Sequence, residues 1–361
     1  MLLNATVSPS PVTNPASPTA SRKDEHLRIN INEDVAAKGV DAGFDDYRFV
    51  HRALPEIDLD DVDLGSRFLG RAVGAPLLVS CMTGGTEQAG IINARLARVA
   101  QSRGLGMGLG SCRVLLERPD VLPTFDVRPI APDVPLLANL GAVQLNLGVG
   151  VEECRYLMRT LRADALVLHL NPLQEALQPA GNTMFAGLLA RIETVCTELG
   201  APVIVKEVGW GIADDLVAQL FDAGVTAVDV AGAGGTSWSE VERHRIDDPV
   251  RARVAGAFGG WGIPTTTALI GARRAVPDGT IIASGGVRNG IDIAKALALG
   301  ADSVGIAGPL VRAAAAGDAA LEETVAVMLE ELRLVMFCVG ASHVGALWSD
   351  ARLARNDGTA V

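Results

Sequence analysis

The sequence predicts an α/β fold, a single (β/α)8 TIM barrel, for most of its 361 residues. Short apolar runs, the pattern of strands buried on both faces, recur eight times along the chain. They start at Pro76, Gly104, Pro135, Ala165, Pro202, Thr226, Thr280 and Ser303. Stretches with helical periodicity separate most of them, and several end in Gly. Starts that lie mostly 23 to 37 residues apart indicate alternating strands and helices of a closed barrel.

A doubly wound open sheet is the alternative architecture. It would normally carry a phosphate-binding fingerprint after its first strand, and the GGT that begins at Gly84 is not one. We expect four segments: a disordered extension over residues 1–21, an arm and pre-barrel segment over 22–71, the barrel over 72–347 and a tail over 348–361. The extension is rich in Ser, Pro, Thr and Ala and lacks the apolar core of a signal peptide.

The interval between strands six and seven is too long for one helix. About 54 residues separate their starts, and the insertion runs from Gly234 to Thr266 with Trp238 and Trp261 near its ends. A long loop in a compact barrel is usually functional, so we expect it to cover the site. Residues 317 to about 347 are predicted to form one or two amphipathic helices, which pack on the barrel or on a neighbouring subunit.

Composition excludes several classes of protein. Hydrophobic residues make up 49% of the chain and its net charge is -11, so a basic face for nucleic acid is not expected. No apolar run reaches the length that spans a membrane. Five scattered cysteines favour a reduced, cytoplasmic compartment and a structural role over disulfides or zinc.

Polar, small or ionisable residues follow every predicted strand, and a barrel places its site at these carboxyl ends. In order they are Met82-Thr83-Gly84, Ser111-Cys112-Arg113, Asn139, the cluster from His169 to Glu175, Lys206-Glu207, Gly234-Gly235-Thr236, Gly285 to Arg288, and Ala307-Gly308. A single strand that ends this way means little, but eight together predict the mouth of an active site.

The turns GGVRNG and GIAGPL, after strands seven and eight, predict a phosphate site. Glycine lets bare backbone approach a phosphate, helix N-termini direct N–H groups at it, and Arg288 could add charge. The alternative is two tight turns that need Gly only for their geometry. Lys206 lies within an apolar strand, where an ammonium needs an anion. We favour a ligand as its partner over an internal salt bridge with a residue such as Glu207.

A second anionic site is indicated at the fourth strand. Glu175 is a hard oxygen ligand suited to Mg²⁺ on substrate phosphates, and Gln174 beside it can donate and accept hydrogen bonds. His169 could pair with a phosphate or act as acid or base. The basic segment RKDEHLRI holds Arg22, Lys23, His26 and Arg28, and is either an arm that folds over an anionic ligand or a solvated helix face.

These motifs together closely resemble a known family, the type 2 isopentenyl-diphosphate isomerases, which are FMN-dependent barrels. The resemblance runs from Arg22 to about Ser342. It includes RKDEH, MTGGT, GSCR, ANLGA, HLNPLQE followed by QPAGN, IVKEVG, GAGGTSW, WGIPT, ASGGVRNG and GIAGPL. MTGG or GGV alone would be weak, but the combination is highly specific.

The resemblance implies a set of contacts, position by position. FMN would contact Met82, Thr83, Gly84, Ser111, Asn139, Lys206 and Thr236, and its phosphate would meet Gly286, Val287, Arg288, Ala307 and Gly308. The substrate diphosphate would meet Arg22, Lys23, Ser111 and Arg113. Gln174, near the reacting carbons, and His169 are the implied catalytic residues, Glu175 would bind Mg²⁺, and His26 and Asn171 match further polar positions.

The implied reaction converts isopentenyl diphosphate to dimethylallyl diphosphate by adding one proton and removing another. An unactivated alkene is a poor base, so the family uses reduced flavin as acid and base, with NADPH as reductant and no net redox change. The protein then supplies position and excludes water. The family also implies a homo-oligomer, a tetramer or octamer.

The chain departs from the family's usual pattern at four positions. Ala180 and Asn182 stand where acidic residues are common, Cys112 where Gln is usual, and Ala231 where Ser is frequent. We expect activity with altered affinities. The rivals are another FMN barrel, such as an α-hydroxy-acid oxidase, and a non-catalytic relative that binds flavin or isoprenoid phosphate. The oxidase would need a base histidine in an HGG turn after a late strand, where this chain has Gly234-Gly235-Thr236.

Overall fold

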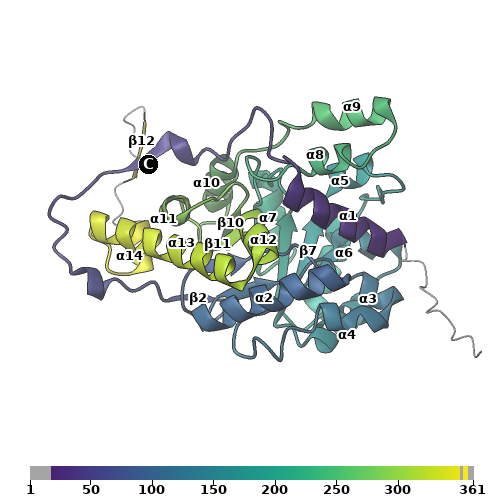
Figure 1. The fold of residues 1–361 in the computed structure, drawn as a ribbon, viewed down its shortest axis with the longest axis horizontal. Helices are drawn as coiled ribbons and strands as arrows, with labels where there is room; N and C mark the ends of the chain where they lie inside the picture. Colours follow the sequence, from purple (N-terminus) through teal and green to yellow (C-terminus); the bar gives the residue numbers. More distant parts are fainter. Residues whose placement is uncertain (1–17, 350–352, 357–361) are drawn as a thin grey trace, which may run out of the picture.

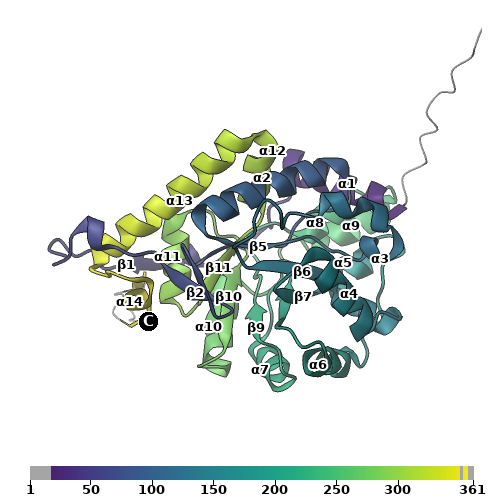
Figure 2. The same ribbon diagram turned by 90° about the horizontal axis from the view of Figure 1, so that it is seen from below.

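The computed structural model describes residues 18–349 and 353–356 and forms a parallel β-barrel surrounded by helices (Figures 1 and 2). Within these residues, eight parallel strands pair in chain order, and the last closes on the first. They are β4 (Leu77–Val79), β5 (Gly106–Gly108), β6 (Leu136–Gly141), β7 (Ala165–Leu170), β8 (Val203–Glu207), β9 (Ala227–Asp229), β10 (Thr280–Ser284) and β11 (Ser303–Ile306). Each lies within a predicted apolar run, so the predicted barrel is confirmed.

Helices alternate with these strands and bury one face against the barrel. They are α2 (Glu87–Arg103), α3 (Val114–Glu117), α4 (Val151–Leu161), α5 (Pro172–Leu177), α6 (Leu188–Glu198), α7 (Asp214–Asp222), α10 (Thr265–Ala275), α11 (Gly290–Ala298) and α12 (Gly308–Ala316), with the 3-10 turns η3 (Pro119–Thr124) and η4 (Ala142–Leu147). The ends of α2 show the local causes. Thr86 accepts a hydrogen bond from the amide of Ala89, and Gly104 ends the helix with a φ of 65°.

A short hairpin packs near the N-terminal ends of the barrel strands. It consists of β2 (Ser66–Phe68) and β3 (Arg71–Val73), which are antiparallel. Phe68 and Val73 are buried in one cluster with Ala165 and Ala227, the residues that open β7 and β9. The sequence predicted only an irregular segment here, because three-residue strands are too short to show an alternating pattern.

The remaining elements before the barrel and after it pack together. They are η1 (Phe44–Asp46), β1 (Tyr47–Phe49), η2 (Leu59–Asp61), α13 (Asp318–Val339), α14 (Val344–Ser349) and β12 (Leu353–Arg355). β12 pairs antiparallel with β1. The predicted amphipathic helix is confirmed as α13, which buries Leu321, Val325 and Met328 at helical spacing and packs on α11 and α12.

Two segments lie over the carboxyl ends of the barrel strands. α1 (Pro18–Asn32) begins four residues before the expected boundary at Arg22, and residues 1–17 of the expected extension lie outside the described residues. The long insertion after β9 contains α8 (Trp238–Arg243) and α9 (Pro249–Ala257). α8 contacts both α1 and α5, and the three helices lie side by side in Figures 1 and 2.

Candidate active site

A cavity of about 490 Å³ opens at the carboxyl ends of the barrel strands. Its wall contains every residue that the sequence analysis assigned to catalysis, cofactor, substrate or metal: Arg22, Lys23, Met82, Thr83, Gly84, Ser111, Arg113, Asn139, His169, Gln174, Glu175, Lys206, Thr236, Gly286, Val287, Arg288, Ala307 and Gly308. The strands bring them together because parallel strands of a closed barrel end on the same side. Their assigned roles remain predictions.

The basic segment of α1 faces this cavity. Lys23 Nζ donates to the carbonyl oxygens of Gly84 at 2.9 Å and Ser111 at 2.7 Å, and it lies 5.0 Å from the centre of the Phe125 ring. Burial lowers the pKa of Lys23 to about 8. Arg28 behaves differently, because its side chain is exposed and lies 3.9 Å from Glu33. The geometry therefore favours an arm over the site for Arg22, Lys23 and His26, and a solvated face for Arg28.

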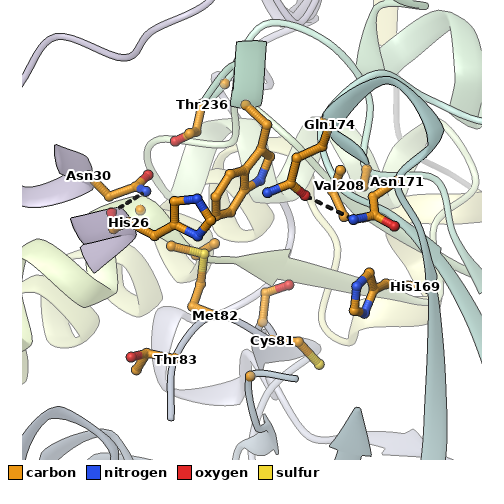
Figure 3. Close-up of a pocket in the computed structure, with 18 of the residues that line it drawn as sticks. His26, Asn30, Cys81, Met82, Thr83, His169, Asn171, Gln174, Val208 and Thr236 are labelled. Carbon is orange, nitrogen blue, oxygen red and sulfur yellow. Dashed lines mark hydrogen bonds between the residues drawn. The ribbon is translucent and has the colours of Figure 1, made fainter. Parts of the chain in front are cut away.

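Two hydrogen bonds fix the orientation of Gln174, and Figure 3 shows the one from Asn171. Asn171 Nδ2 donates to Gln174 Oε1 at 3.0 Å, and Gln174 Nε2 lies 3.3 Å from Glu242 Oε1. A carboxylate only accepts and an amide nitrogen only donates, so these two neighbours permit one orientation of the Gln174 amide. His26 Nε2 lies 2.9 Å from the same Glu242 oxygen, and its ring meets Trp238 edge to face.

Glu242 is a residue that the sequence analysis missed. Its side chain is fully buried on α8 and forms an ion pair with Arg245 at 2.6 Å. Burial by itself would raise the pKa of Glu242, but the hydrogen bond from His26 and the charge of Arg245 outweigh it and lower that pKa. In the sequence, Glu242 lies in a strongly charged stretch that is typical of an exposed helix. Only the packing of α8 on α1 and α5 distinguishes it from a surface carboxylate.

Of the two tryptophans of the insertion, only Trp238 lines the cavity. Trp261 is 61% exposed and stacks edge to face on Phe258. The insertion therefore covers the site through α8.

The Glu175 carboxylate is held by residues at both ends of α5 and just after it. Its Oε1 accepts from Asn171 Nδ2 at 3.1 Å, and its Oε2 accepts from the side chain of Gln178 and, at 2.6 Å, from the backbone amide of Asn182. Asn182 makes its contact through the backbone, so a neutral side chain at this position keeps the contact. Ala180 is exposed, at a φ of 56°. Both departures from the family's pattern therefore leave the hydrogen bonds to the Glu175 carboxylate in place.

Lys206 has a partner that the sequence analysis did not name. Its Nζ lies 3.3 Å from Asp229 Oδ2, and it also donates to the backbone oxygen of Glu207 at 2.9 Å. An internal ion pair is therefore present, and its acid is Asp229, not Glu207; because Lys206 also lines the cavity, its contact with a ligand stays a prediction. Glu207 directs its carboxylate elsewhere, accepting from the amides of Gly209 and Trp210.

His169 is neutral near pH 7, because burial, aided by the charge of Lys206, lowers its pKa to about 4. Its Nδ1 lies 2.7 Å from Asn139 Oδ1, an acceptor, so Nδ1 carries the proton. Nε2 is therefore left as an acceptor. In this arrangement His169 can receive a proton or a hydrogen bond at Nε2, and it has no proton to give there.

The turn after β10 uses glycine for a geometric reason. Gly286 has a φ of 71°, and a Cβ there would lie 2.6 Å from the Ala42 side chain. Arg288 lines the cavity, and its guanidinium donates to Gly234 O at 3.4 Å. α12 begins at Gly308, so its N-terminus faces the same cavity. Glycine is required here for the geometry of the turn, and the same turn exposes backbone that a phosphate can approach. The phosphate site and the purely geometric explanation are therefore compatible.

The other two departures from the family's usual pattern, Cys112 and Ala231, are at buried positions. The Cys112 side chain is buried and donates to Gly110 O at 3.2 Å, and burial raises the pKa of Cys112 to about 11. Ala231 has a φ of 39°, and its amide donates to Asp229 Oδ1 at 3.2 Å. Neither side chain changes the charge of the cavity wall.

The closed barrel, with its cavity at the carboxyl ends of the strands, defines a class, the TIM-barrel proteins. The structure resembles an (S)-mandelate dehydrogenase, with a TM-score of 0.66 at 15% identity over 93% of this chain and 99% of that one. It also resembles a mandelate oxidase, with a TM-score of 0.62 at 18% identity over 93% and 98%. At these identities the likeness concerns the fold. The family model described as FMN-dependent dehydrogenase matches residues 169–354.

Sequence relatives define the family within this class. An isopentenyl-diphosphate delta-isomerase of Nostoc sp. is 48% identical over 345 residues, which cover 96% of this chain and 99% of the relative. Isomerases of the same description from Synechococcus sp. and Rickettsia felis are 53% and 49% identical, over 90% and 89% of this chain and 94% and 92% of theirs. The chain belongs to the isopentenyl-diphosphate delta-isomerase family, in its FMN-dependent type. Among the described residues, no helix is long and apolar enough to cross a membrane.

Proposed function

We propose that this protein is an isopentenyl-diphosphate delta-isomerase that converts isopentenyl diphosphate to dimethylallyl diphosphate in the cavity at the barrel mouth, with FMN as cofactor. The observation that carries the proposal is the fixed amide of Gln174, which lies in a wall that also contains Glu175 and the cations Arg22, Lys23 and Arg113. Isopentenyl diphosphate requires this combination, because its anionic end and its reacting carbons must be held at once.

The donor set fits FMN on one side of the cavity. Glycine-rich turns and the start of α12 offer backbone N–H groups, and Arg288 offers a guanidinium whose hydrogen bond to Gly234 O is long, at 3.4 Å. When bound in its reduced form, FMN supplies the acid and base chemistry that ordinary side chains lack toward an alkene. NADPH is the reductant that we propose for it.

The chain's own residues bind and orient the substrate. Arg22, Lys23 and Arg113 hold the diphosphate, while Gln174, kept in one orientation by its two neighbours, positions the reacting end. His169 offers an acceptor at Nε2. α1 and α8 cover the cavity and reduce its access to water, which strengthens these electrostatic contacts.

We propose that Glu175 binds Mg²⁺ together with the diphosphate. Its carboxylate is buried in the cavity wall, and Mg²⁺ commonly uses one or two carboxylates with waters and substrate phosphates. The described residues contain no cluster of three or more His, Cys, Asp or Glu side chains that could hold a metal. A substrate-bridged ion is therefore the form that suits this site.

We propose in addition a cytoplasmic homo-oligomer, a tetramer or octamer. All five cysteines are free, which suits a reducing compartment. Val250, Val254 and Trp261, on and after α9, are large apolar residues with 48% to 68% exposure, which suits a subunit contact. Multi-angle light scattering tests the assembly, and a monomer at micromolar concentration would contradict it.

The decisive experiment is an anaerobic isomerase assay with and without FMN, NADPH and Mg²⁺, in which dimethylallyl diphosphate is measured directly. We expect product only when all three are present. Equal product with oxidised flavin and EDTA would refute the cofactor assignments. A protein that binds FMN and gives no product would instead support the non-catalytic relative, and a colourless protein that binds no FMN would refute the flavin site.

A further inference from the structure

Three buried polar side chains from consecutive strands form a closed group beside the cavity. They are Lys206 at the end of β8, Asp229 at the end of β9 and Ser284 at the end of β10. Lys206 and Asp229 are direct partners in the parallel pairing of β8 and β9. Paired residues on neighbouring strands point to the same side, so both side chains enter the barrel.

The hydrogen bonds in this group have one consistent direction. Ser284 Oγ lies 2.6 Å from Asp229 Oδ1, and a carboxylate can only accept, so the serine proton lies on that bond. The serine lone pairs are then free to accept from Lys206 Nζ at 3.3 Å. With Glu207 O at 2.9 Å and Asp229 Oδ2 at 3.3 Å, the three N–H groups of the ammonium have three protein acceptors.

The cavity touches two members of the group. Lys206 and Ser284 line it, whereas Asp229 lies behind them and is 2% exposed. Asp229 therefore does not contact a molecule bound in the cavity, and it acts on that molecule through Lys206 and through its charge. Nothing else in the proposed function requires a carboxylate at this position.

We propose that Asp229 is a positioning residue for the flavin, which fixes the Lys206 ammonium in the cavity wall and offsets its charge. The bound ring then meets a nearly neutral ion pair in place of a free cation. Reduced flavin carries more negative charge than oxidised flavin, so a free cation would stabilise the reduced form more strongly. The pair keeps the reduced form less stabilised, and hence a better proton acceptor and electron donor.

Of the other titratable groups near Lys206, His169 and Cys81 carry no negative charge at neutral pH, and Glu207 is partly ionised there. His169 on β7 is the partner of Lys206 in the strand pairing, and burial lowers its pKa to about 4. Burial raises the pKa of Cys81 to about 12. Burial also raises the pKa of Glu207 to about 7, although the amides of Gly209 and Trp210 oppose that shift. All variants are therefore compared at one pH, and the series is repeated in Glu207→Gln.

The test is the midpoint potential of bound FMN, measured anaerobically without substrate against a reference dye. Asp229→Asn keeps the shape and leaves the cation unpaired. We expect reduced FMN to bind at least about tenfold more tightly relative to oxidised FMN, which raises a two-electron potential by about 30 mV. Lys206→Met leaves the anion unpaired and should lower the potential. The double variant replaces an ion pair of no net charge by two neutral groups. Its midpoint potential should lie between those of the two single variants, near that of the wild type.

Two further variants make the result decisive. Ser284→Ala keeps both charges, so its potential should stay close to that of the wild type. Asp229→Asn buries an unpaired charge, which can prevent folding. In that case the difference in midpoint potential between Lys206→Met and the double variant tests the same proposal, since neutral replacement of a buried pair is tolerated. An unchanged or lowered potential in Asp229→Asn, no difference between Lys206→Met and the double variant, or an equal shift in Ser284→Ala overturns the proposal.

This inference rests on the flavin site of the proposed function and not on the isomerisation. Potentials are measured on FMN-loaded protein without substrate, so absence of turnover would contradict the proposed reaction and leave this test intact. Unchanged potentials in an active isomerase would contradict only the role of Asp229.

Discussion

Glu242→Gln is the substitution that most directly tests how the site holds Gln174. The wild-type carboxylate is buried and lies within hydrogen-bonding distance of His26 Nε2 at 2.9 Å, Arg245 Nη1 at 2.6 Å and Gln174 Nε2 at 3.3 Å. The variant keeps the shape of the side chain and removes its charge. Its new amide can rotate, so it no longer restricts Gln174 to one orientation.

Two effects of different size follow. Removing one partner of a buried ion pair costs about 3 kcal/mol, which lowers Tm by about 4 °C in a protein of this size. Because the pKa of Glu242 is lowered in the folded protein, its contribution to stability is present at neutral pH and is lost as pH falls through that pKa. The Tm difference between wild type and variant should therefore shrink in acid. For turnover, losing a charge-assisted hydrogen bond on Gln174 should cost about 1.4 kcal/mol, a tenfold fall in kcat.

Glu240→Gln is the matched control on the same helix. Glu240 is also buried and forms an ion pair three residues further on, with Arg243 at 2.7 Å, whereas it is Glu242 that lies 3.3 Å from Gln174 Nε2. We expect a similar fall in Tm with unchanged kcat, measured on FMN-loaded protein well below either Tm. Equal losses of kcat in both variants, or full kcat in Glu242→Gln, would refute the argument that Glu242 positions Gln174.

Three further predictions concern the residues proposed to bind Mg²⁺ and the phosphate groups of FMN and the substrate. Glu175→Gln should lower kcat/KM by about 100-fold and abolish its dependence on Mg²⁺, whereas an unchanged Mg²⁺ titration would place the metal elsewhere. Arg288→Ala should weaken FMN binding about 10- to 100-fold, because it removes a charge-assisted hydrogen bond to phosphate; fluorescence titration of the apoprotein measures this, and equal affinity would exclude that contact. Because burial lowers the pKa of Lys23 to about 8, kcat/KM should fall above about pH 8, and Lys23→Arg should remove that break; a break that persists in Lys23→Arg belongs to another group.

Interactions that depend on three-dimensional contact were not accessible from the sequence. The Lys206 partner is an example, because β8 and β9 are separate runs and only their pairing register sets Lys206 beside Asp229. The hairpin of β2 and β3 was missed because each strand has three residues. Glu242 was missed because a charged helix in a long insertion has the same pattern whether it is exposed or packed.

The sequence by itself determined the barrel, the order of its strands and the side on which its polar residues gather. These follow from local apolar runs and from the rule that parallel strands of a closed barrel end together. It also supplied the motifs of the isomerase family. The tertiary structure alone decided which charges are paired, which way the Gln174 amide points and which helix covers the cavity. These depend on distances of a few ångströms between side chains far apart in the chain, such as His26 and Glu242, and no local pattern encodes such a distance.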